Sequence, residues 1–296
     1  MKVAYLLDSS AGVVENPLKD VYVLPLTIIV NDKGAVNQYA DSDGIISLER
    51  LFQFQTHALV TTSQAAIAEV KKKVNHLLTR YDLVVAIPIS SGLSQNYETF
   101  RSLRNEYQER LLLLNCMAVQ SGIEWLVEDL QKFVQANPNF CPTDLLKINE
   151  QNRHLSHGVI MVGNCTQLIR GGRLPSYKGL IIKLMGIRLL IQLNSDVDGK
   201  LSYFDKSFND ENGVVKSIEL IDTKINFKKN GIDKVAYITT FLDEKKNERM
   251  FNLYKAKLME YCGFKGKISQ GRICSTIAVH TGIDTCAIYI KALANK

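Results

Sequence analysis

The sequence predicts an α/β protein of two domains, the first built on a parallel sheet and the second on a mixed or antiparallel sheet. Three observations support this fold class. The 296 residues exceed what one hydrophobic core usually organises. Apolar runs of strand length alternate with amphipathic segments of helical periodicity in the first half. In the second half two apolar runs flank a hairpin signal. We place the domains at residues 1–150 and 151–296.

The first half is expected to form a Rossmann-like domain. Its predicted strands are residues 2–7, 21–30, 82–89 and 110–115. The run 82–89 is continuously apolar, which is typical of a strand buried on both faces of a parallel sheet. The run 21–30 is rich in β-branched residues and contains Pro25, so it fits a bulged or edge strand. Predicted helices cover residues 45–55, 65–80, 93–107 and 121–137, whereas the polar segment 31–44 is expected to be a loop.

The second half shows a different pattern, beyond Pro138 and Pro142. A helix is expected over 143–155, and then strands at 158–163, 187–193 and 199–204, the last two joined as a hairpin. Further predictions are helices at 210–229 and 246–261 and strands at 234–241, 265–269 and 285–290. This order predicts an α/β domain with antiparallel pairing.

Composition and charge favour a folded cytoplasmic protein. Hydrophobic residues make up 46% and charged residues 22%, ordinary values for a globular chain. The apolar run 180–193 is interrupted by Lys183 and Arg188, too short to span a membrane, and the start of the chain lacks the apolar core of a signal peptide. Six scattered cysteines predict reduced thiols rather than disulfides or zinc. The net charge of +6 is too diffuse to predict nucleic-acid binding.

Two hydroxyl clusters are each expected in a loop that enters a helix. They are "TTSQ" at 61–64 and "SSGLS" at 90–94, and the second follows a strand directly. Because ligands in parallel sheets bind beyond the carboxyl ends of the strands, these hydroxyls could hold an anion. Helix capping is the alternative, since Thr61 and Gln64 have capping-box spacing and Ser94 could cap alone.

Three further features could carry chemistry. Gly171 and Gly172 allow close approach of the backbone, and Arg173 supplies a permanent cation, although a plain turn fits as well. His280 is the histidine best placed to act as a base. A serine hydrolase or acyltransferase using Ser91 or Ser94 with His280 is therefore an alternative, but the G-x-S-x-G nucleophile elbow is absent. No metal site is expected.

Taken together, the motifs resemble in order those of the DegV family. They are "DSSA" at 8–11, "VLPL" at 23–26, "YADSD" at 39–43, "TSQ" at 62–64, "SSGLSQNY" at 90–97, "GGR" at 171–173 and "HTG" at 280–282. The resemblance covers nearly the whole chain, and its most specific part is the TSQ motif followed about 28 residues later by SSGLS.

The resemblance implies a DegV-like fold that holds one long-chain fatty acid, such as palmitate, in a tunnel between the domains. It implies a lipid-binding protein without catalytic residues, cofactor or metal. It also implies the role of the acyl-carrying subunit of a bacterial fatty acid kinase in phospholipid metabolism, for which a separate ATP-binding subunit would be the partner. Transient contact with a membrane surface fits this role. By matching position, the carboxylate would be bound by Thr62, Ser91 and Ser94, with support from Ser63, Arg173, His280, Gly171 and Gly172.

The chain departs from the family pattern at several places. Gln95 and Asn96 replace a glycine and a threonine, and Asn115 and Gln120 replace an aspartate and a serine. Two further departures lie in the second half. Phe208 stands where the family's docking surface has an arginine, and Asp284 brings a negative charge to the loop after His280.

Overall fold

The computed structural model describes residues 1–41, 46–174 and 187–294. The chain folds into two compact units. The first contains Met1–Arg153, Ser195–Lys200 and Cys274–Thr276, and the second contains His154–Asn194, Leu201–Ile273 and Ile277–Lys296. The motif residues Ser42, Asp43, Pro175 and Ser176, the start of the helix predicted at 45, and residues 180–186 of the apolar run lie outside the described residues.

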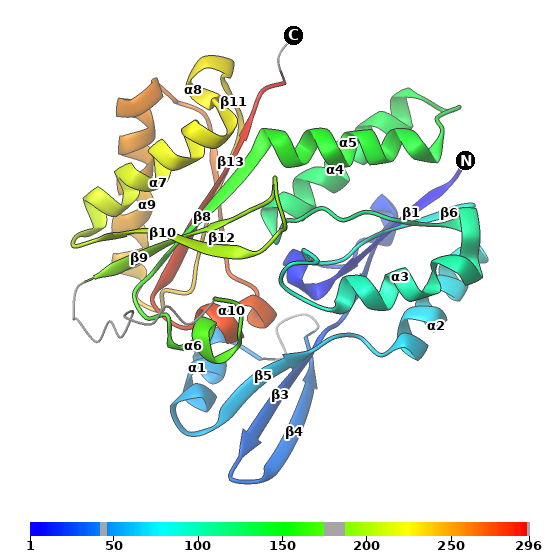
Figure 1. The fold of residues 1–296 in the computed structure, drawn as a ribbon, viewed down its shortest axis with the longest axis horizontal. Helices are drawn as coiled ribbons and strands as arrows, with labels where there is room; N and C mark the ends of the chain where they lie inside the picture. The colour runs from blue at the N-terminus through cyan, green and yellow to red at the C-terminus, as the bar shows by residue number, and fades with distance from the viewer. Residues whose placement is uncertain (42–45, 175–186, 295–296) are drawn as a thin grey trace. The chain divides into compact units, whose positions relative to one another are not determined.

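The first unit is built on a sheet of four parallel strands (Figure 1). Its order is β2 (Val21–Leu24), β1 (Val3–Asp8), β6 (Leu83–Ile87) and β7 (Leu111–Leu113). Successive side chains of a strand point to opposite faces, so Ala4 and Leu6 pack toward α2 (Ile67–Leu78) and α3 (Asn96–Tyr107), while Tyr5 and Leu7 pack toward α4 (Ser121–Ala136) and α5 (Pro142–Leu155). The predicted Rossmann-like parallel sheet, buried on both faces, is confirmed.

A second, antiparallel sheet in this unit corrects three sequence predictions. Its strands are β4 (Ala35–Ala40), β3 (Thr27–Asp32) and β5 (Leu59–Ser63), with α1 (Leu48–His57) before β5. The single strand predicted over 21–30 is wrong: β2 ends before Pro25, which has no N–H to continue a ladder, and β3 belongs to the other sheet. Segment 31–44 is not only a loop, because Ala35–Ala40 form β4. The chain turns from β3 into β4 at Lys33 and Gly34, which both have positive φ. Thr61, Thr62 and Ser63 lie in a strand rather than a loop.

The second unit contains a mixed sheet of six strands. Its order is β10 (Leu201–Ser207), β9 (Arg188–Leu193), β8 (Ser156–Val162), β13 (Thr285–Ala292), β11 (Ile232–Thr239) and β12 (Ile268–Arg272). All neighbours are antiparallel except β11 and β12, which confirms the predicted mixed sheet and the β9–β10 hairpin. Apolar residues of α7 (Asp210–Ile225) and α9 (Glu244–Cys262) form one core with the sheet.

Three short helices in the second half were not predicted as such. Residues 210–229 form two helices instead of one, because Asn226 adopts the left-handed conformation between α7 and α8 (Phe227–Asn230). The other two are α6 (Thr166–Arg170) and α10 (Ser275–Thr281), and the second carries His280. No helix in the part of the chain that the structure describes is long and apolar enough to cross a membrane.

The buried carboxylate of Asp8 ties together the segments that follow the parallel strands. Asp8 ends β1 and is fully buried. One carboxylate oxygen accepts hydrogen bonds from the backbone N–H (3.0 Å) and hydroxyl of Ser10, and the other accepts from the N–H of Ile89 (2.9 Å) and the amide of Asn96 (2.7 Å). Burial raises the pKa of Asp8, and the four donors oppose this rise because they favour the carboxylate.

The substitution Asp8→Asn tests this role. An amide group in place of one oxygen leaves at least one buried N–H without an acceptor, so the free energy of unfolding should fall by about 2 kcal/mol. Urea unfolding of the purified variant measures the change. Asp82→Asn is the control, because the Asp82 carboxylate is exposed and accepts a single bond from Lys2 N, and it should cost less than about 0.5 kcal/mol. Equal stability of the two variants would contradict the role of Asp8.

Candidate functional site

The "SSGLS" loop connects β6 to α3 and is partly used for packing. Ser90 is fully buried, and its hydroxyl donates a hydrogen bond to the carbonyl oxygen of Gly199 at 2.6 Å. A Cβ on Gly92 would lie 2.4 Å from the carbonyl oxygen of Asp198. Ser90 and Gly92 therefore pack against residues 195–200 of the same unit. The Ser90 hydroxyl has a structural role rather than a binding role.

Ser91 and Ser94 are half-buried and accept hydrogen bonds from the scaffold. The Ser91 hydroxyl oxygen accepts from the Asn115 amide at 2.8 Å, while the Asn115 oxygen accepts from Ser91 N at 3.4 Å. The Ser94 hydroxyl oxygen accepts from Asn96 N at 3.2 Å. A hydroxyl has one proton and two lone pairs, so each serine keeps its proton for another acceptor while it is held in place. The N-cap of α3 is Gln95, which provides no side-chain hydrogen bond, so the capping role considered for Ser94 is wrong.

The "TTSQ" residues are positioned by a strand rather than by a cap. Thr62 is half-buried in β5 and pairs with Ile28 of β3, and Ser63 is exposed, with its hydroxyl 3.3 Å from the Gln64 carbonyl oxygen. The N-cap of α2 is Ala66, which provides no side-chain hydrogen bond. The capping box predicted from Thr61 and Gln64 is therefore wrong.

Asn96 links the two hydroxyl-bearing segments. Its side chain is fully buried; the amide nitrogen donates to Asp8 at 2.7 Å, and the oxygen accepts from the backbone N–H of Ala65, just after the TTSQ segment, at 3.4 Å. Sequence reasoning noted Asn96 and Asn115 only as departures from a pattern and missed both roles. The available signal was Asp8, a charged residue at the end of a buried strand, because a buried charge requires polar partners.

The second unit brings Gly171, Gly172, Arg173 and His280 into one neighbourhood. A Cβ on Gly171 would lie 2.6 Å from His280 Nδ1, so only glycine allows this approach, and Gly172 has the positive φ that favours glycine. Arg173 donates a hydrogen bond to the Gly171 carbonyl oxygen. Burial, helped by the charge of Arg173, lowers the pKa of His280 to about 3. His280 is therefore neutral at pH 7 and a weak base.

Asp284 is neutralised by its own neighbours. Its carboxylate pairs with Arg188 Nη1 at 2.6 Å and with Lys246, and Arg188 also pairs with Asp210 at 3.1 Å. The negative charge noted in the sequence thus belongs to a local ion-pair network. Within residues 1–41, 46–174 and 187–294, no group of three His, Cys, Asp or Glu side chains could hold a metal ion.

These features define an α/β protein of two units, with a parallel sheet whose strand ends carry hydroxyls and a mixed sheet. The chain belongs to the DegV family: the model of this family of uncharacterised proteins matches residues 2–292. A DegV domain-containing protein of Mycoplasma genitalium is 27% identical over 98% of this chain and 99% of its own length.

Two solved structures share the fold. A DegV family protein from Thermus thermophilus, described for its fatty acid binding, has a TM-score of 0.81 at 18% identity and covers 99% of this chain and 100% of its own. A DegV family protein from Eubacterium eligens loaded with heptadecanoic acid has a TM-score of 0.80 at 15% identity, over 98% of this chain and 100% of its own.

The pKa of His280 predicts a pH dependence of stability. The folded pKa of about 3 lies below the usual 6.5, so the unfolded chain binds the proton first as the pH falls, and stability decreases below pH 6.5. The decrease is at most about 1.4 kcal/mol per pH unit. Urea unfolding at pH 7, 6 and 5 should show a smaller decrease for His280→Gln than for the unchanged protein, and parallel curves would contradict the burial of a neutral His280.

Proposed function

We propose that this protein binds one long-chain fatty acid, with its carboxylate held by the hydroxyls of Thr62, Ser91 and Ser94 and its acyl chain in an apolar tunnel. One observation carries the proposal. In a chain of the DegV family, Ser91 and Ser94 each accept a hydrogen bond from a fixed N–H donor, which leaves both protons for an anion. The fatty acids named for the two solved DegV relatives support the choice of ligand.

The physical chemistry of the ligand agrees with such a site. Hydrogen bonds to a charged group contribute roughly 1.5–3 kcal/mol each, which offsets part of the cost of removing a carboxylate from water. Burial of the acyl chain contributes about 0.8 kcal/mol per methylene before entropic costs, so the chain dominates affinity. In this proposal Arg173 supplies positive charge and neutral His280 a hydrogen bond, while Gly171, Gly172 and Ser63 complete the binding loops.

The same features make hydrolysis a poorer explanation. A serine nucleophile needs a base whose pKa lies near the working pH, whereas that of His280 is about 3. We therefore propose a binding protein rather than an enzyme. A fluorophosphonate probe should label neither Ser91 nor Ser94 at pH 7, and stoichiometric labelling of either serine would favour a hydrolase or acyltransferase.

Mass spectrometry of an organic extract of the purified protein tests the ligand. About one equivalent of a C14 to C18 fatty acid is expected. After removal of the lipid, calorimetric titration with palmitate should show affinity about tenfold lower for Ser91→Ala and Ser94→Ala, which corresponds to about 1.4 kcal/mol. Ser102→Ala is the matched control, because this α3 hydroxyl bonds to the Thr99 carbonyl oxygen at 2.8 Å. Absence of a bound acid, together with no uptake of palmitate, would refute the proposal.

We further propose that the bound acid is presented to a separate ATP-binding kinase subunit, as the family resemblance implies. Phe208, which replaces the expected arginine, is 68% exposed, and Lys206 Nζ lies 5.6 Å from the centre of its ring. With [γ-32P]ATP alone the loaded protein should form no acyl phosphate. Addition of the kinase subunit from the same cells should produce one that hydroxylamine traps. No transfer in the presence of that subunit would refute this step.

A further inference from the structure

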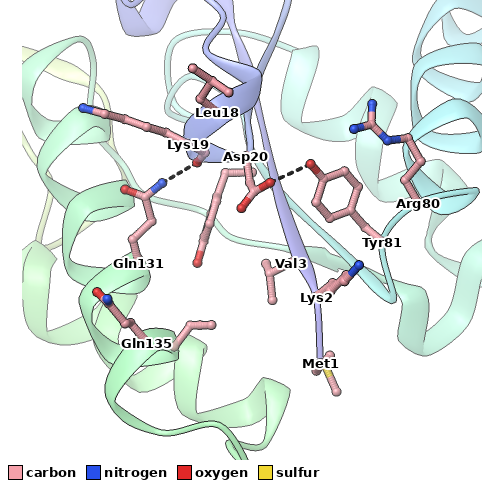
Figure 2. A pocket seen from close by; sticks show the side chains of 12 residues that line it. Met1, Lys2, Val3, Leu18, Lys19, Asp20, Arg80, Tyr81, Gln131 and Gln135 are labelled. Atoms are coloured by element: carbon pink, nitrogen blue, oxygen red, sulfur yellow. Dashed lines mark hydrogen bonds between the residues drawn. The ribbon is translucent and has the colours of Figure 1, made fainter.

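A cavity of about 980 Å3 opens at the amino-terminal edge of the parallel sheet (Figure 2). Its lining residues precede the strands: Lys2 lies before β1, Lys19 and Asp20 before β2, and Arg80 and Tyr81 before β6. The last turns of α4 complete the wall with Gln131 and Gln135. The hydroxyls of Ser91 and Ser94 follow β6 and therefore lie beyond the opposite edge of this sheet, so the cavity is separate from the candidate fatty acid site.

Tyr5 gives this cavity an unusual lining group. The side chain is only 3% exposed, and its hydroxyl has no hydrogen-bond partner among the described residues. Burial and the nearby Asp20 charge raise the pKa of Tyr5, so the hydroxyl stays protonated and remains a donor. A buried donor without an acceptor lowers stability, and its retention beside a cavity points to an acceptor supplied from outside the chain.

The charges around the cavity favour an anion. Lys2, Lys19 and Arg80 line it, whereas Asp20 is its one acidic residue. The Asp20 carboxylate already accepts a hydrogen bond from Tyr81 at 2.6 Å (Figure 2). None of the three basic side chains forms an ion pair within the described part of the chain. The carbonyl end of α2, which would repel an anion, is covered by Arg110, whose guanidinium donates to Leu78 O at 2.8 Å and Tyr81 O at 3.3 Å.

We propose that this cavity binds a phosphate monoester of about the size of a nucleoside monophosphate. The phosphate interacts with the basic side chains at the rim, and an acceptor atom on the organic part takes the hydrogen bond of the Tyr5 hydroxyl. A volume of about 980 Å3 is within the range of small-molecule sites.

Isothermal titration calorimetry of the full chain with AMP, GMP, CMP and UMP tests this site. At least one should bind saturably with a Kd below about 1 mM. Arg80→Gln should weaken binding about fivefold or more, because this exposed residue supplies positive charge at the rim. Tyr5→Phe should also weaken binding about fivefold, yet it should raise the thermal midpoint of the ligand-free protein, since it removes an unpaired buried hydroxyl.

Tyr254→Phe is the matched control for the hydroxyl. Tyr254 is fully buried in the core of the second unit, and its hydroxyl lies near Ser217 and Cys286, away from the cavity. This variant also removes a buried tyrosine hydroxyl, but it should leave the nucleotide affinity unchanged. No binding of any of the four nucleotides at about 5 mM would overturn the proposal. Equal affinity for inorganic phosphate would overturn it too, because it would indicate a general anion site at the rim.

Discussion

The arrangement of the candidate site depends on one buried carboxylate. Asp8 stands where β1 ends, and its two oxygens accept hydrogen bonds from the next turn of its own chain, from the segment after β6 and from the first residue of α3. A charge so fully removed from water is tolerated only when donors surround it. The requirement for those donors fixes where the strand-end segments lie, and Asn96 extends the constraint to the backbone that follows TTSQ.

Fixed amides determine which hydroxyls are available to a ligand. Ser90 donates its proton to Gly199 and is fully engaged, whereas Ser91 and Ser94 accept bonds and keep theirs. Asn115 is important here: an aspartate at this position would accept the Ser91 proton, but the amide donates to Ser91 instead. Asn115, which replaces the aspartate of the family pattern, thus leaves the Ser91 proton available as a hydrogen-bond donor. Ser91 and Ser94 can therefore each donate a hydrogen bond to an anion.

The sequence predicted those parts of the fold that are governed by continuous burial. The run that forms β6 and the amphipathic periodicity of α4 were recognised because their side chains pack into large cores. Strand β4 was missed because nearly all of its residues are exposed, so it shows no apolar signal. The sequence pointed to the TTSQ hydroxyls as candidate binding groups but placed them in a loop. Their position in β5 could not be predicted, because this strand forms by pairing with β3. The links made by Asn96 could not be predicted, because they join residues 31 and 88 positions apart.

The most direct test is a crystal structure of the purified protein with its bound lipid. The account predicts a fatty acid whose carboxylate oxygens lie about 2.5–3.2 Å from the hydroxyls of Ser91 or Ser94. In that structure the Asn115 amide should still donate to Ser91, and the Asp8 and Asn96 side chains should be unchanged. A carboxylate held elsewhere, with both serine hydroxyls turned toward protein acceptors, would contradict the central claim.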